Sequence, residues 1–311
     1  MTVAILAGAA PAPAPEAVIR ELVAADARVL AVSHRLQTRG VALCPRQDAE
    51  PGMTLHAFEQ YAPALRPTVA RMLSLRPGGL AVLATAPGGA AERAGVRPGD
   101  VLLAIGGTTV PAAGSAPDRL RATAALLRPS GAARVELHLA RQGALETVVL
   151  ALQPACRSRV QLRPSRRPRA WSDGQLVTVT SALLDFTRSD AELAFVLGHE
   201  IAHNALGHGK RGSRRARELA ADALALRLMT AAGYPTSGVP AFVDRLYRGP
   251  AGGLFPSIGH LGRRERLRAI REELGRHDLN VAARQQYSWL GKLFSRSDLF
   301  ARAVCDKHAL A

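Results

Sequence analysis

One segment, His199-Glu200-Ile201-Ala202-His203, constrains the fold of this 311-residue chain more than any other. Residues 189–192 have the form of a capping box, and apolar residues then recur at helical spacing. Histidines four residues apart share one helix face, with Cβ atoms about 5–6 Å apart. Two such imidazoles can bind one metal ion, while Glu200 projects at a different angle. On this segment alone, two surface histidines on an ordinary capped helix remain an alternative.

A second expected helix supplies acidic residues. Glu218 and Asp222 are its only acids, and the residues that follow Glu218 are largely apolar. Carboxylates on a largely buried helix need a hydrogen-bonding or positively charged partner. A metal ion at Glu218, with Asp222 accepting a hydrogen bond from a ligating histidine, would provide such partners. The alternative is a pair of acids that stabilise the start of the helix through its dipole.

The two helices together predict a site for one zinc ion per chain. The predicted ligands are His199, His203 and Glu218. Three protein ligands leave one coordination position open, whereas structural zinc sites usually have four protein ligands. Glu200 is the predicted base that removes a proton from a water molecule.

The region from residue 66 to 154 changes character, with short β-type runs between Gly- and Pro-containing turns. Strands are expected at 80–85, 101–105, 134–140 and 146–152, with a helix at 120–127. Residues 89–102 resemble the core signature of bacterial PDZ domains, which bind peptides by adding a strand to a sheet edge. By this resemblance, the peptide-binding loop falls at Leu73, Ser74 and Leu75, with Ser74 in place of the expected glycine. The alternative is a PDZ fold that serves as a spacer or lid.

Motifs between Cys156 and Leu274 resemble those of the HtpX-like and CAAX-prenyl-protease-like zinc metallopeptidases, which are gluzincins. The matching segments are Trp171-Ser172-Asp173-Gly174, His199 to Asn204, Glu218 to Asp222, Ala232-Gly233-Tyr234-Pro235, and His260 followed by Arg266. The resemblance implies the same zinc ligands and base, with Asp222 steadying His199. It also implies that His260 and Arg266 lie near the active site, where His260 would hydrogen-bond an oxyanion. Leu261 stands where the family has proline.

The expected fold is α+β, with a helical zincin-type core, a small sheet and a β-rich PDZ-like module. The expected domains are an N-terminal segment (1–65), the PDZ-like domain (66–154) and the zinc metallopeptidase domain (155–311). The first segment predicts a helix over 15–39 and then a loop over 45–52. Residues 157–169, with six arginines, predict a solvated linker. A strand is predicted over 175–183.

The predicted function is zinc-dependent endopeptidase activity on polypeptide substrates, with the PDZ-like module capturing peptides or regulating the enzyme. The alternative is a peptide-binding quality-control module with a non-catalytic zinc site. The formal net charge of +16 is carried almost entirely by arginine, as is typical of a GC-rich genome. No nucleic-acid motif accompanies the charge, so we expect no specific nucleic-acid partner. Association with a membrane surface stays open.

Two features of the sequence bear on the cellular compartment. No apolar run reaches the roughly 18 residues that a bilayer-spanning helix needs. Val3 to Ala10 form a short apolar stretch before Ala-Pro repeats, which indicates either a signal remnant or a flexible tether. With the family resemblance, this favours a periplasmic or envelope-associated protein, the cytoplasm being the alternative. In an exported protein Cys44 and Cys156 can pair, while unpaired thiols are equally compatible with the sequence.

Overall fold

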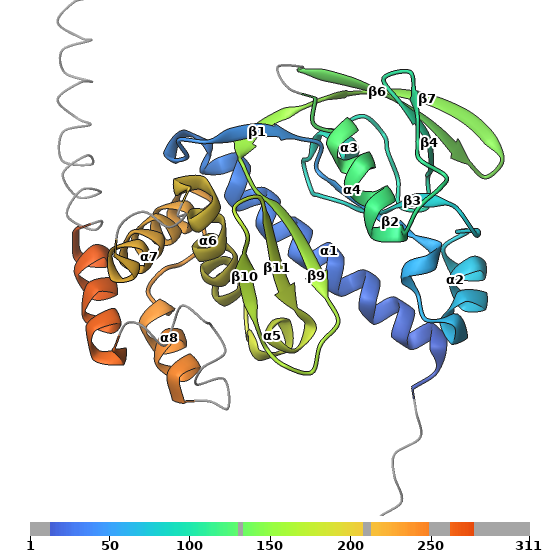
Figure 1. Ribbon diagram of the computed structural model, residues 1–311. Coiled ribbons are helices and arrows are strands. Elements are labelled where there is room, and N and C mark those ends of the chain that lie inside the picture. The colour runs from blue at the N-terminus through green and yellow to red at the C-terminus, as the bar shows by residue number, and fades with distance from the viewer. Residues whose placement is uncertain (1–12, 130–132, 208–212, 249–261, 277–311) are drawn as a thin grey trace, which may run out of the picture.

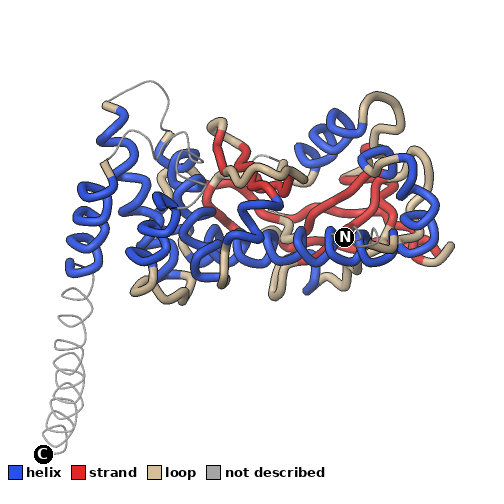
Figure 2. Tube along the Cα trace, turned by 90° about the horizontal axis from the view of Figure 1, so that it is seen from below, coloured by secondary structure: helices blue, strands red, loops and turns tan. Residues whose placement is uncertain are grey.

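The computed structural model describes residues 13–129, 133–207, 213–248 and 262–276. Its combination of helices and several sheets confirms the α+β fold expected from the sequence. Helices dominate one end of the molecule and strands the other, as Figure 2 shows. The largest cluster of buried apolar residues lies at the helical end, and a second lies within the strand-rich end.

Helix α1 (Pro15–Arg39) has the bounds predicted from its apolar spacing and extends from the helical end to the strand-rich end (Figure 1). Its residues Val29, Val32 and Leu36 are buried in the largest core. Its helical partners there are α6 (Asp190–Leu206) and α7 (Arg214–Ala231). The other helices at this end are α5 (Ser181–Phe186), α8 (Val239–Arg248) and a helix over residues 263–276. None of the described helices is both long and apolar enough to span a bilayer.

A three-stranded sheet, in the order β10-β11-β9, packs beside α6. Strand β9 (Arg159–Arg163) is parallel to β11 (Leu176–Thr180), and β10 (Ala170–Ser172) is antiparallel to β11 and forms an edge. The prediction of a solvated linker at 157–169 is therefore wrong for β9, because pairing with β11 satisfies its backbone groups. The strand predicted over 175–183 ends at Thr180, where α5 begins.

The strand-rich end is a sheet in the order β2-β3-β4-β6-β7, with β5 paired to β4. Its strands are β2 (Met53–Ala57), β3 (Leu80–Thr85), β4 (Val101–Ile105), β5 (Thr108–Thr109), β6 (Arg134–Arg141) and β7 (Ala144–Ala151). Its helices are α2 (Arg66–Met72), α3 (Ala90–Arg93) and α4 (Ala116–Leu126), with 3₁₀ turns at Phe58–Gln60 and Pro63–Leu65. A further 3₁₀ turn, Val41–Leu43, follows α1 and contacts α7. Strand β2 thus joins this sheet from a position before residue 66, where the module was expected to begin.

The segment Leu73 to Leu75, expected to bind peptides, joins α2 to β3. Leu75 is fully buried in a cluster with Ile19 and Val69. Strand β3, which follows this segment, pairs with β2 on one side and β4 on the other, so it has no open edge. The edge strands of this sheet are β2, which contacts α4, and β7, which contacts α3. The edge of β3 is therefore covered by β2, and peptide binding at Leu73, Ser74 and Leu75 stays a prediction.

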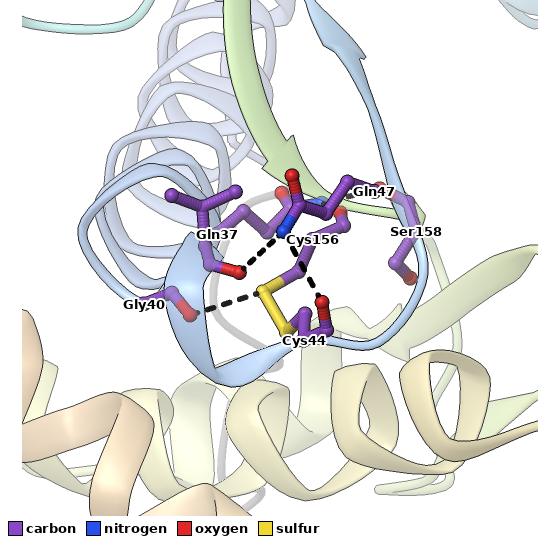
Figure 3. Close-up of a disulfide and its surroundings, with 7 residues drawn as sticks. Gln37, Gly40, Cys44, Gln47, Cys156 and Ser158 are labelled. Atoms are coloured by element: carbon purple, nitrogen blue, oxygen red, sulfur yellow. Dashed lines mark hydrogen bonds between the residues drawn. A yellow bond between two sulfur atoms is a disulfide. The ribbon is translucent and has the colours of Figure 1, made fainter.

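A two-stranded antiparallel ribbon, β1 (Gln47–Glu50) with β8 (Gln153–Cys156), connects the two ends of the molecule. The loop predicted over 45–52 therefore contains a strand, since β8 provides its partner. Cys44 and Cys156 form a disulfide across 112 residues, with Cα atoms 5.4 Å apart (Figure 3). The Gln37 side chain of α1 donates to the carbonyl oxygens of Cys156, at 3.0 Å, and of Ser158.

Replacing Cys44 and Cys156 together with serine should lower the free energy of unfolding by about 2–4 kcal/mol, because the disulfide restricts the unfolded chain. Urea denaturation in non-reducing buffer, followed by circular dichroism, measures the change. Cys305→Ser leaves this disulfide intact and should unfold at the wild-type urea concentration. Equal stability of the wild type and the double variant would contradict a stabilising cross-link.

Candidate metal centre

The helix that carries the two histidines is fixed at both ends by its own sequence. At its start, the Ser189 hydroxyl accepts the Glu192 N–H at 3.3 Å, and the Glu192 carboxylate accepts the Arg188 N–H at 2.7 Å. At its end, Gly207 has φ of 62°, a left-handed conformation that favours glycine. These caps define the position of α6 along the chain, and His199 lies in its buried part.

Helices α6 and α7 approach closely where small residues meet. A Cβ built at Gly198 would lie 3.4 Å from both Cα and Cβ of Ala225, so a larger residue there would push the helices apart. This approach brings the two histidines of α6 against the two carboxylates of α7. His199, Glu218 and Asp222 are all less than 5 % exposed.

His199, His203 and Glu218 converge on one point. The two histidine Nε2 atoms lie 3.1 Å apart, and Oε2 of Glu218 lies 3.3 Å and 3.7 Å from them. Donors about 2.1 Å from a tetrahedral zinc ion lie about 3.4 Å from one another, a value that these distances bracket. Oε2 of Glu218 is also buried without a hydrogen-bond partner in the described chain, so a cation would satisfy it. Among the described residues, this is the one group of three such side chains suited to hold a metal ion.

Asp222 orients His199. Oδ1 of Asp222 lies 2.8 Å from Nδ1 of His199, and an ionised carboxylate only accepts, so Nδ1 carries the hydrogen. Nε2 of neutral His199 therefore presents its lone pair to the metal position. Arg266, on the helix over 263–276, donates from Nε to Oδ2 at 2.8 Å and from Nη2 to Oδ1 at 2.6 Å. Asp222 and Arg266 thus lie next to His199, on the side away from its Nε2 atom.

The electrostatics of this group favour a cation. Burial acts to lower the pKa of His199, but Asp222 and Glu218 outweigh it and raise that pKa to about 9. Burial acts to raise the pKa of Glu218, but the two nearby histidines outweigh it and lower the pKa. Burial also acts to raise the pKa of Asp222, but Arg266 and His199 outweigh it and lower that pKa. Both carboxylates are therefore ionised at neutral pH, and a metal ion would displace the proton from His199.

Glu200 lies beside this group and lines a cleft of about 630 Å³ together with His203 and Glu218. Its Oε2 accepts a hydrogen bond from the Ser172 hydroxyl of β10 at 2.9 Å. The side chain is not part of the three-residue group, which agrees with the sequence-based separation of ligands from base. Its carboxylate is therefore oriented by the sheet.

Sequence reasoning missed the contacts that position this cleft. The Asn204 side chain accepts the Gly174 N–H at 2.7 Å and donates to the Ser158 hydroxyl at 2.8 Å. The available signal was the family resemblance, whose matching segments contain Ser172, Gly174 and Asn204. The hydrogen-bond partners of these residues depend on how β10 packs beside α6, which the sequence does not show. His260, the other predicted catalytic residue, lies outside the described residues.

Two family models match the chain. Residues 152–213 match peptidase family M48, and residues 82–141 match the PDZ domain. These matches confirm the resemblance to a metallopeptidase of this type with a PDZ domain. The M48 match contains His199, Glu200 and His203 and ends before Glu218. It indicates a metallopeptidase, and peptidases of this family depend on a metal ion.

No curated protein matches the chain. Similar solved structures include an HtrA-type protease, AlgW, with a decapeptide, at 20% identity over 35% of this chain and 30% of that chain, with a TM-score of 0.26. Another is a photosystem II D1 C-terminal processing protease, at 26% identity over 35% and 24% of the two chains, also with a TM-score of 0.26. The match thus spans less than a third of either solved chain, and TM-scores this low establish no shared overall fold.

Asp222→Asn should weaken metal binding by about 10- to 100-fold, because the amide cannot orient His199 as the carboxylate does. Titration of metal-free protein with zinc against a competing chelator measures the affinity. Asp185→Asn removes the same charge from an exposed position on α5 and should bind zinc as the wild type does. Wild-type affinity in Asp222→Asn would rule out an orienting role for Asp222.

Proposed function

We propose that this protein is a zinc-dependent endopeptidase. The observation that carries the proposal is the convergence of His199, His203 and Glu218, with metal-binding atoms within 4.8 Å of one another, in a cleft that also holds Glu200. Two imidazoles and one carboxylate are a donor set suited to zinc. The match to peptidase family M48 supports the reaction class.

The residues around the cleft divide the chemistry between them. Zinc, when bound by the three ligands, lowers the pKa of a water molecule and polarises the scissile carbonyl. Glu200 accepts the proton of the attacking water and passes it to the leaving amine. The Ser172 hydroxyl holds one oxygen of Glu200, so the base is oriented before substrate arrives. Asp222 and Arg266 hold His199 in the tautomer that binds metal.

The substrate position follows from the sheet beside the cleft. Strand β10 is an edge strand, and Trp171, Ser172, Asp173 and Gly174 at its end line the cleft. An extended polypeptide can add to this edge and pass the metal centre. A second peptide can add to β2 of the PDZ-like module, which supports a role of that module in capture or regulation.

A peptide-binding module with a structural zinc site is the alternative. Structural sites usually have four protein ligands, whereas the group in the described chain has three and borders an open cleft. Both features favour catalysis.

We also propose that the protein works in the periplasm or cell envelope. The Cys44–Cys156 disulfide supports this location, because disulfides persist in oxidising compartments and are rare in the cytosol.

Glu200→Gln should keep the zinc content and fold of the wild type while turnover falls by at least about 10²-fold, because glutamine cannot accept the proton. Metal analysis and hydrolysis of a fluorogenic peptide measure the two quantities. Glu272→Gln, an exposed carboxylate on the helix over 263–276, is the matched control and should cleave at the wild-type rate. Hydrolysis by Glu200→Gln at the wild-type rate would exclude Glu200 as the base. If Glu200→Gln loses zinc, Glu200 has a structural role, and the binding-module alternative is favoured.

Fractionation of a bacterium that expresses the native gene should place the protein in the periplasmic or envelope fraction. After denaturation without reductant, a maleimide–polyethylene glycol reagent should label Cys305 and leave Cys44 and Cys156 unmodified. Reduction should expose all three cysteines, and Cys305→Ser should show no label before reduction. A cytosolic protein with three reactive thiols would contradict export.

A further inference from the structure

Two basic clefts lie next to each other on the molecule. The metal-centre cleft is lined by Arg46, Arg214 and Arg217. A second cleft of about 950 Å³ lies between α4 and the ribbon of β1 and β8, and its arginines are Arg121, Arg128, Arg157 and Arg159. Apart from Glu200 and Glu218, the acidic residues that line the two clefts are Asp173 and Asp48. Both clefts therefore carry an excess of positive charge.

Consecutive residues of two segments line the two clefts. Arg46 lines the metal-centre cleft, and the next residue, Gln47, lines the second cleft. Likewise, Gly174 lines the metal-centre cleft and Gln175 lines the second cleft. Backbone hydrogen bonds hold these segments together: Arg157 N–H donates to the Arg46 carbonyl at 2.9 Å. Arg159 N–H donates to the Gln175 carbonyl at 2.7 Å. The clefts are therefore neighbours along one surface.

Arg159 lies where the positive charges crowd. Burial lowers the pKa of its guanidinium, and the charges of Arg128 and Arg121 lower it further, while Asp173 and Asp48 act in the opposite direction. Arg128 is paired with buried Glu50 at 2.7 Å, yet the repulsion on Arg159 persists. A negative charge from a ligand would relieve this repulsion.

Arg46 carries positive charge to the metal centre. Its guanidinium packs over Gly207, where an added Cβ would lie 2.6 Å from Nη2. Gly207 ends α6 four residues after His203, so the guanidinium lies at the helix C-terminus, where the dipole favours a cation. The charge is thus held on one side of the cleft that contains Glu200.

We propose that the two clefts form one basic track that binds an acidic segment of the polypeptide substrate and leads it to the metal centre. The proposal rests on the proposed endopeptidase function. An extended peptide advances about 3.3 Å per residue, so one short acidic segment can contact both clefts. Arginine suits this role because its fork of donors matches a carboxylate. Among the described residues that line the two clefts, Trp171 is the one Phe, Tyr or Trp side chain. The track therefore lacks the series of aromatic rings on which successive bases stack, which favours a polypeptide over a nucleic acid.

The test uses fluorogenic peptides with one cleavable core and a flanking segment rich in Glu, Gln or Lys. At low salt, wild-type kcat/KM for the Glu peptide should exceed that for the Gln peptide by at least about 5-fold. This ratio corresponds to the free energy of one good surface ion pair. The Lys peptide should be the poorest substrate. The Glu preference should shrink at 1 M salt, where the screening length is about 3 Å.

Four variants locate the effect. Arg46→Gln and Arg159→Gln should each reduce the Glu-to-Gln ratio by about 3- to 5-fold. Arg46→Lys keeps the charge and should retain most of the preference. Arg20→Gln removes one charge from the exposed face of α1 and lines neither cleft, so it should leave the ratio unchanged. Thermal unfolding of each variant verifies that the fold is intact.

Equal kcat/KM for the Glu and Gln peptides would overturn the track and leave the endopeptidase function standing. An effect of Arg20→Gln as large as that of Arg46→Gln would also overturn it, because net charge would then explain the preference. If no peptide is cleaved, the endopeptidase function fails, and fluorescence anisotropy with Glu200→Gln still tests the track through its Glu-to-Gln binding ratio. Arg159-dependent binding of a single-stranded oligonucleotide without discrimination between the peptides would favour a nucleic-acid ligand instead.

Discussion

Buried carboxylates need partners, and the arrangement around α7 follows from satisfying two of them, Glu218 and Asp222. Asp222 is held by Arg266 and His199, so its two oxygens connect α7, α6 and the helix over 263–276. Glu218 faces two imidazoles, and its Oε2 has no hydrogen-bond partner in the described chain. The same packing that stabilises one carboxylate therefore prepares the other for a cation. The close contact of Gly198 with Ala225 permits this packing.

A second constraint connects the metal centre to α1. The Gln37 side chain donates to the Ser158 carbonyl, and the Ser158 hydroxyl accepts from Asn204. Asn204 in turn accepts the Gly174 N–H at the end of β10. The edge strand beside Glu200 is thus positioned from α1 through the junction that also carries the disulfide. Because α1 also contacts β3, one helix supports both the sheet of the PDZ-like module and the cleft.

The sequence allowed prediction where the determining interactions are local. The two histidines and Glu200 share one capped helix, and the bounds of α1, β3 and β4 follow from periodicity and turn residues. Strands β1 and β9 could not be predicted, because each is paired only through a distant partner, β8 or β11. The pairing of β2 with β3, which follows the predicted peptide-binding segment, could not be predicted for the same reason. Ser172 and Arg46 reach the cleft through strand and loop packing that no local pattern encodes.

The disulfide and the ribbon of β1 and β8 lie where the chain enters and leaves the PDZ-like module. The largest core contains residues of α1 before Cys44 and residues after Cys156, whereas the core of the PDZ-like module lies between them. The Cα atoms of Cys44 and Cys156 are 5.4 Å apart, a distance that one or two residues can span. The module is therefore an insertion within the part that carries the metal centre, and that part is discontinuous in sequence. Its loss would leave the ends of that part close enough to rejoin, but it would also expose the face of α1 around Ile19 that packs against the module.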